Sequence, residues 1–177
     1  MSEKEFTDEH ELIKAITNLA LNPHSLISID GVDGVGKSTL ANKIKAKLST
    51  HYIELDTFVQ EQKGGYIEYL DYDKLQDEIG HLMTTNALIV IEGICIQQVL
   101  KRTGLTSDLS IYVKVIDGNN FWMDQFRFFP SGKSAEEVIE DRKSKKFSLG
   151  HTEEIIRYHY RFKPHKTSDW IFVRYEQ

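Results

Sequence analysis

One eight-residue segment constrains this chain more than any other. Residues 31–38 read GVDGVGKS, which fits the pattern of glycine, four residues, glycine, lysine and serine or threonine that surrounds nucleotide phosphates. The apolar run LISID precedes the segment, and apolar residues recur at helical spacing through TLANKIKAKL after it. Because the pattern is specific when it lies between a strand and a helix, the sequence predicts a nucleotide site here.

The residue types of this segment suit an anion. Its glycines allow backbone dihedrals that other residues avoid, so that successive N–H groups can turn inward around a phosphate. A helix that begins near Lys37 adds N–H donors and the positive end of its dipole. Lys37 can bridge the outer phosphates, and the Ser38 hydroxyl can bind Mg²⁺. The expected cofactor-binding residues are Gly31, Val32, Asp33, Gly34, Val35, Gly36, Lys37, Ser38 and Thr39.

Strands and helices are expected to alternate along the chain. The expected strands cover 26–30, 51–56, 87–93, 109–115 and 170–175, and helices are expected near 8–21, 37–48, 73–83, 96–100 and through most of 117–162. This alternation predicts an α/β three-layer P-loop fold, with a five-stranded parallel sheet, helices on both faces and a helical lid at about 118–162. The length predicts a single domain over residues 1–177, in which residues 1–24 are a helical addition.

The amino-terminal helix precedes the first expected strand. Thr7 is its expected cap, and Asn22-Pro23 is expected to end it. One face of this helix is apolar, through Leu12, Ile13, Ile16, Leu19 and Ala20. We expect this face to pack against the sheet, and a dimer contact is the alternative, so a homo-oligomer stays open.

Composition excludes several classes of partner. The formal net charge of −5 disfavours a nucleic acid polymer. Cys95 is the only cysteine, which excludes an intrachain disulfide framework, leaves no thiolate cluster for structural zinc and fits a reducing compartment. Because no apolar run approaches the length of a membrane span and the amino terminus is acidic, we expect a cytoplasmic protein with no membrane partner.

Two carboxylates are expected beside the glycine loop. In a parallel sheet, ligands bind at the carboxyl ends of the strands, where Asp56 and Glu92 end the second and third expected strands. Glu92 is placed to hold or orient Mg²⁺, and Asp56 to accept the proton of an attacking hydroxyl in a phosphoryl transfer. The alternatives are a Glu92 that meets solvent and an Asp56 that caps the turn at Thr57.

Four segments resemble the uridine kinase family of P-loop nucleoside kinases: IDGVDGVGKSTLA, ELDTF, IVIEGI and RYHYRFKPHKTSDWIFV. The resemblance implies an ATP-dependent kinase that uses Mg²⁺ and phosphorylates a hydroxyl of a nucleoside or similar small molecule. It also implies that Asp56 contacts the acceptor hydroxyl and that Glu92 lies near the metal and the phosphates.

The lid region departs from that family, which follows its fourth strand with an arginine-dense segment. Here the segment reads DGNNFWMDQFRFF, in which Arg127 is the single arginine. A transferring phosphoryl group needs cations near its oxygens, and we assign Arg127 and Arg142 to this role. The alternatives are that other basic residues take it, or that transfer is weak or absent. Those residues are Lys143, Lys145, Lys146, Arg157 and Arg161.

The acceptor-binding residues are less well marked. The segment from Thr57 to Tyr72 is expected to be a long loop with a functional role. Tyr66 and Tyr69 are placed to stack on a substrate base, although packing against the protein is equally compatible with the sequence.

Two other functions stay open. The segment DGVDGVGKST also resembles thymidylate kinase, a nucleoside monophosphate kinase, but no Asp-Arg pair of the kind used in that family follows the third expected strand. The arginine-poor lid also fits a nucleotide-binding regulatory domain that has no transferase activity.

Overall fold

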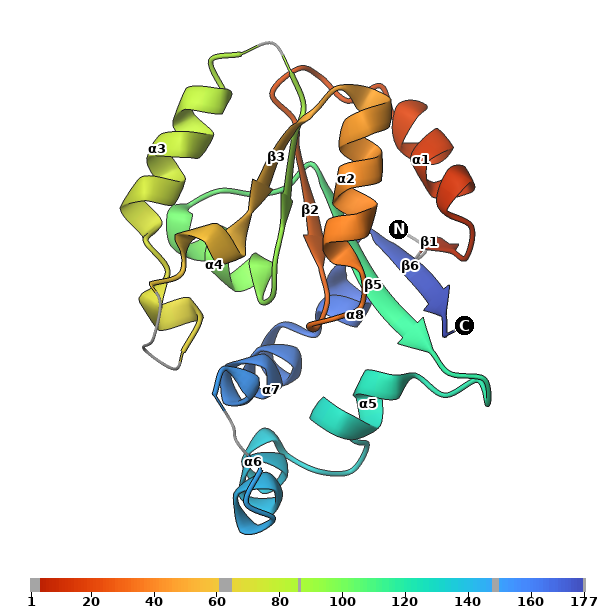
Figure 1. Ribbon diagram of the computed structural model, residues 1–177, viewed down its shortest axis with the longest axis vertical. Helices are drawn as coiled ribbons and strands as arrows, with labels where there is room; N and C mark the ends of the chain where they lie inside the picture. Colours follow the sequence, from red (N-terminus) through yellow and green to blue (C-terminus); the bar gives the residue numbers. More distant parts are fainter. Residues whose placement is uncertain (1–3, 61–64, 86, 148–149, 177) are drawn as a thin grey trace.

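The strands of the protein form one parallel sheet. The computed structural model describes residues 4–60, 65–85, 87–147 and 150–176 (Figure 1). Within these ranges the sheet has six strands in the order β1-β6-β5-β2-β4-β3. The strands are β1 (Lys4–Phe6), β2 (Leu26–Asp30), β3 (His51–Glu54), β4 (Ile89–Glu92), β5 (Leu109–Ile116) and β6 (Trp170–Tyr175). The predicted α/β fold with a parallel sheet is confirmed.

The prediction of five strands was wrong, because β1 is a sixth. Lys4 pairs with Trp170 and Phe6 with Phe172, so the start of the chain lies beside its last strand. Three residues are too few to show a strand period, and only Phe6 of the three is buried. The segment before β2 therefore contains a strand as well as a helix.

Helices cover both faces of the sheet. They are α1 (Glu9–Thr17), α2 (Lys37–Leu48), α3 (Tyr72–Leu82), α4 (Ile96–Thr103), α5 (Met123–Phe128), α6 (Ala135–Ser144), α7 (Thr152–Phe162) and α8 (Pro164–Thr167), with short 3₁₀ helices η1 (Leu55–Phe58) and η2 (Ile67–Tyr69). Right-handed crossovers place α2 on one face and α4 and α8 on the other. Figure 1 shows α5, α6 and α7 beyond the carboxyl ends of β2 and β5. In the part of the chain described, no helix has the length and apolarity needed to cross a membrane.

The amino-terminal helix differs from the prediction in its cap and its end. Asp8, not Thr7, is the N-cap, and its Oδ1 accepts the N–H of Glu11 at 2.8 Å. The helix ends four residues earlier than expected, so that Leu19 and Ala20 lie beyond it and are exposed. It packs on α2 and on strand β1 of the sheet, and Leu12 and Ile16 are buried in the main core.

Several other boundaries also differ. The strand expected at 51–56 ends at Glu54, and the chain tightens into η1, so Asp56 lies in a 3₁₀ turn just past the strand. The loop expected at 57–72 contains part of η1, η2 and an antiparallel bridge between Val59 and Leu70, while its residues 61–64 lie outside the described ranges.

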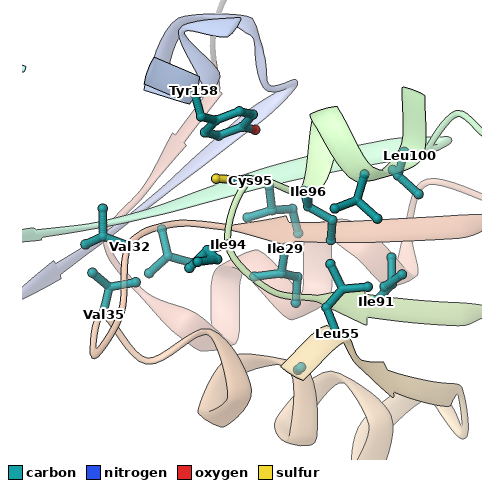
Figure 2. Packing of buried hydrophobic residues seen from close by; sticks show 14 of the residues in the cluster. Ile29, Val32, Val35, Leu55, Ile91, Ile94, Cys95, Ile96, Leu100 and Tyr158 are labelled. Atoms are coloured by element: carbon teal, nitrogen blue, oxygen red, sulfur yellow. The ribbon is translucent and has the colours of Figure 1, made fainter. Parts of the chain in front are cut away.

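The glycine loop rests on the main apolar core. Every residue of β2 and of β4 is buried, as expected for strands covered on both faces. Figure 2 shows Val32 and Val35 of the loop pointing into the same cluster as Ile29 and Ile94. Burying a valine side chain stabilises a fold by about 1.5 kcal/mol or more, so these two residues anchor the loop to the core.

Candidate nucleotide site

The loop between β2 and α2 has a backbone that needs glycine. A Cβ on Gly31 would lie 2.7 Å from the carbonyl oxygen of Val113, so any side chain there would push the loop away from β5. Gly36 has a φ of 91° and immediately precedes α2. The loop therefore stays close to the sheet while it turns into the helix, as the sequence predicts.

Lys37 and Ser38 are the first two residues of α2. Lys37 is only 8% exposed, and its Nζ donates a hydrogen bond to the carbonyl oxygen of Val32 at 2.9 Å. The ammonium group thus lies against the loop whose N–H groups are expected to surround phosphates. This placement fits the predicted role of Lys37 toward an anion bound in the loop.

Glu92 ends β4 beside this loop. Its side chain is almost fully buried, and its Oε1 accepts hydrogen bonds from Ser38 Oγ at 2.7 Å and from the Tyr52 hydroxyl at 2.9 Å. Burial and the bond to Glu92 raise the pKa of Tyr52, which keeps that hydroxyl a neutral donor. A hydroxyl and a carboxylate in contact are oxygen ligands of the kind that Mg²⁺ prefers, so these residues fit a magnesium ion.

Asp56 lies on the same edge of the sheet. The register pairs Glu54 with Glu92, and Asp56 follows two residues later in η1, where it is exposed. Its Oδ1 accepts a hydrogen bond from the Tyr66 hydroxyl at 2.8 Å. Asp56 is therefore held at the edge of the sheet where ligands bind in such folds.

The two tyrosines of the acceptor loop are placed differently. Tyr66 is 6% exposed, so its ring is buried in the protein interior. Its hydroxyl donates the hydrogen bond to Asp56. Burial raises its pKa, which keeps the hydroxyl protonated. Tyr69 is half-buried and lines a cavity of about 340 Å³ with Glu68, Glu154 and Arg157. The Tyr66 hydroxyl therefore contacts Asp56, and Tyr69 lines a cavity together with Glu154, which binds the Tyr66 backbone.

The two lid arginines contact each other but do not line the same set of clefts. Arg127 is exposed on α5 and lines a cleft of about 590 Å³ with the loop residues Asp33 and Gly34. Arg142 lies on α6, where its Nη2 donates to the carbonyl oxygen of Arg127 at 2.9 Å and its guanidinium lies 5.3 Å from the ring centre of Phe128. Only Arg127 therefore shares a cleft with the glycine loop.

Arg174 is a loop contact that the sequence analysis missed. It lies near the end of β6, and its Nη1 donates to the carbonyl oxygen of Val35 at 2.7 Å. Arg174 also lines the 590 Å³ cleft. The available signal was its position, because a basic residue near the carboxyl end of the last parallel strand lies at the ligand-binding edge.

Helix α7 contacts both the glycine loop and the segment that contains Tyr66, which the sequence did not reveal. His151, its N-cap, contacts Asp33 of the loop, with 2.6 Å between His151 Nε2 and Asp33 Oδ2. One turn further along, Glu154 accepts the backbone N–H of Tyr66 at 2.6 Å. A single helical turn thus connects the glycine loop to the segment that holds Asp56.

A buried carboxylate joins β2 to the same helix. Asp30 is 2% exposed, and its Oδ1 accepts the N–H of Gly31 at 2.7 Å. The Tyr158 hydroxyl of α7 donates to its other oxygen. Burial raises the pKa of Asp30 to about 6, against the effect of these hydrogen bonds. Asp30 serves as a structural link beneath the loop.

Together, the parallel sheet, the glycine loop after β2 and the buried lysine at the start of α2 define a P-loop nucleotide-binding domain of uridine kinase-like fold. The family model described as the KAP family P-loop domain matches residues 9–177. This chain therefore belongs to the KAP family of P-loop domains. No curated protein matches the sequence.

Solved structures with a similar fold include two whose TM-score is above 0.5. A possible uridine kinase from Bacillus stearothermophilus is 14% identical with a TM-score of 0.58, and the match covers 93% of this chain and 96% of that one. A candidate fructose transport system kinase from Silicibacter sp. TM1040 is 13% identical with a TM-score of 0.53, covering 94% and 99%. At these identities the similarity shows the fold alone.

Proposed function

We propose that this protein is a kinase that transfers the terminal phosphoryl group of ATP to a hydroxyl of a small molecule. A nucleoside is the proposed acceptor. The observation that carries the proposal is the placement of Asp56, which Tyr66 holds at the same sheet edge as Glu92 and the glycine loop. A P-loop that only bound a nucleotide would have no need of a carboxylate at that position. The kinase-like fold supports the same reading.

The donor side would bind the phosphates with the loop N–H groups, the start of α2 and the ammonium group of Lys37. Ser38 and Glu92 would hold Mg²⁺. Bound Mg²⁺ would offset the negative charge of the phosphate oxygens. Arg127, which lines the cleft beside the loop, is the proposed stabiliser of charge from the lid.

The acceptor side would activate the hydroxyl. Asp56 would accept the hydroxyl proton while the acceptor oxygen forms its bond to the terminal phosphorus and the bond to the bridging oxygen of ADP breaks. The hydrogen bond from Tyr66 would fix the orientation of the carboxylate during this step. Tyr66 is thus a proposed positioning residue, while the cavity beside Tyr69 is the proposed place for part of the acceptor.

The remaining parts of the proposal concern organisation and location. Residues 1–177 would form one domain, in which residues of about 118–162 act as the lid over the site. Cys95 is 1% exposed, and burial raises the pKa of its thiol, which fits an unreactive cysteine in a reducing cytoplasm.

A nucleotide-binding regulatory domain is the second candidate, and the position of Arg142 favours it. The guanidinium of Arg142 is directed to a backbone carbonyl and an aromatic ring of the lid rather than to the glycine loop. A lid with so little charge at the phosphates would slow transfer.

An acceptor screen tests the proposal. Purified protein with Mg-ATP would be given nucleosides, nucleoside monophosphates and sugars one at a time, and release of ADP measured. We expect a nucleoside to stimulate ADP release in the wild type but not in Lys37→Ala. Stimulation by monophosphates alone would favour the thymidylate kinase type. Tight ATP binding without stimulation by any acceptor would contradict the proposal and favour the regulatory domain.

A further inference from the structure

Among the described residues, Arg127 is the lid arginine that lines the cleft beside the glycine loop. Asp33 adds a further negative charge, because it is an exposed residue of the loop that would surround phosphates. The cations that lower the pKa of Asp33 are His151, Lys37 and Arg127, with the hydrogen bond from His151 the largest effect. His151 is thus the lid group whose hydrogen bond acts most strongly on Asp33.

The imidazole of His151 is held where both sides of the site meet. Its Nε2 lies 2.6 Å from Asp33 Oδ2, and its side chain is 46% exposed, so a bound anion beside Asp33 can reach it through solvent. Glu154, one turn along α7, binds the backbone of Tyr66, which in turn holds Asp56. Helix α7 is therefore fixed on the acceptor side while its first turn contacts the donor loop.

This contact also favours the charged form of the imidazole. The hydrogen bond to Asp33 and the negative charges of Asp33, Glu154 and Asp56 raise the pKa of His151, against a lowering by partial burial. A raised pKa keeps more of the histidine cationic near neutral pH. The titratable and charged groups that bear on this pair are Asp33 and Lys37 from the loop and α2, Asp56 from η1, Arg127 from α5 and Glu154 from α7.

We infer that His151 is the lid cation that contacts the terminal phosphate of the nucleotide bound in the P-loop. In the structure its imidazole pairs with Asp33, and a bound terminal phosphate would offer it a second, more highly charged anion next to the same loop. His151 would thus distinguish ATP from ADP and support the role that an arginine-dense lid segment would otherwise fill. This inference rests on the proposed function.

The test compares the affinities for Mg-ATP and Mg-ADP of purified wild type and three variants by isothermal titration calorimetry at pH 6.5 and pH 8.5. In the wild type at pH 6.5, ATP should bind more tightly than ADP. His151→Gln should reduce that preference about tenfold, since a hydrogen bond to a charged group is lost, and should leave ADP affinity nearly unchanged. His151→Arg should keep the preference at both pH values.

The pH comparison separates a charge from a structural role. As the pH rises through the pKa of His151, the wild type should lose the preference that depends on the imidazolium, while His151→Arg should not. His10→Gln, a change to an exposed histidine of α1, is the matched control and should behave like the wild type.

The outcomes distinguish this inference from the proposed function. Equal loss of ATP and ADP affinity in His151→Gln, or an unchanged ATP preference, would overturn the role of His151 while leaving the kinase proposal intact. Wild-type protein that binds neither nucleotide would overturn both.

Discussion

The glycine loop and the outer surface of helix α6 are held in the protein in different ways. Val32 and Val35 anchor the loop in the main core, with 2% and 3% of their surfaces exposed. Helix α6 is joined to α7 by the pair of Glu136 and Arg157, in which both side chains are half or more exposed. Helix α6 also buries Ala135, Val138 and Ile139 in that core. The comparison therefore teaches that buried apolar side chains anchor both segments, whereas the exposed pair between α6 and α7 adds a contact that water can replace.

The largest expected effect comes from the donor half. Lys37→Ala should lower acceptor-dependent ADP release by at least about a hundredfold, because the ammonium group that the loop holds for the phosphates is lost. The rate would be measured with saturating Mg-ATP, and circular dichroism would check that the fold is kept. A folded variant with activity near the wild-type level would contradict the proposed role of Lys37 in phosphate binding.

The second prediction tests the difference in anchoring directly. Ile29→Ala removes a fully buried side chain beneath the loop and should lower the free energy of unfolding by about 2–5 kcal/mol. Arg157→Ala breaks the exposed α6–α7 pair and should cost about 1 kcal/mol or less. Urea unfolding measures both values. Similar losses in the two variants would contradict the contrast between the buried side chains under the loop and the exposed α6–α7 pair.

The third prediction concerns the buried link between β2 and α7. The unfolded chain loses the Asp30 proton near pH 3.8, whereas the native protein keeps it up to about pH 6. Between these values the native state binds more protons, so the free energy of unfolding should fall as the pH rises, by an amount on the order of 3 kcal/mol.

Asp30→Asn should remove that part of the pH dependence, because the amide does not titrate. Urea unfolding at intervals from pH 4 to pH 7 would compare the two slopes. If the free energy of unfolding changed with pH equally in the wild type and the variant, Asp30 would be ionised in the native protein throughout this range. That result would contradict the prediction.

The smallest expected effect is at Tyr66. Tyr66→Phe removes the hydroxyl that donates to Asp56 and keeps the buried ring, so turnover should fall by only about three- to tenfold, equivalent to about 1 kcal/mol. Affinity for Mg-ATP should stay unchanged, because this contact lies on the acceptor side. A loss of ATP affinity instead would place Tyr66 in the donor half.

The same contrast explains what could be predicted from the sequence. The glycine loop, Lys37 and the buried strands are encoded by neighbouring residues, so local patterns identify them. Strand β1 is three residues long and depends on a partner more than 160 positions away, with Lys4 opposite Trp170. No local pattern marks such a pairing.

The candidate site shows the same limit. The approximate place of Asp56 followed from the end of a strand, but its partner Tyr66 comes from a loop that has no period to read. Arg174 and His151 reach the loop from 139 and 118 positions away, and neither belongs to a local motif that points to the loop. Their roles become visible only when the fold brings the segments together.

The most direct test of the central claim is acceptor-dependent ADP release in Asp56→Asn. With the best acceptor from the screen, the variant should bind Mg-ATP as tightly as the wild type and lose about a hundredfold or more of the acceptor-stimulated rate, because the amide cannot take the hydroxyl proton. An Asp56→Asn variant that transfers phosphate at the wild-type rate would show that Asp56 is not the base and would contradict the account.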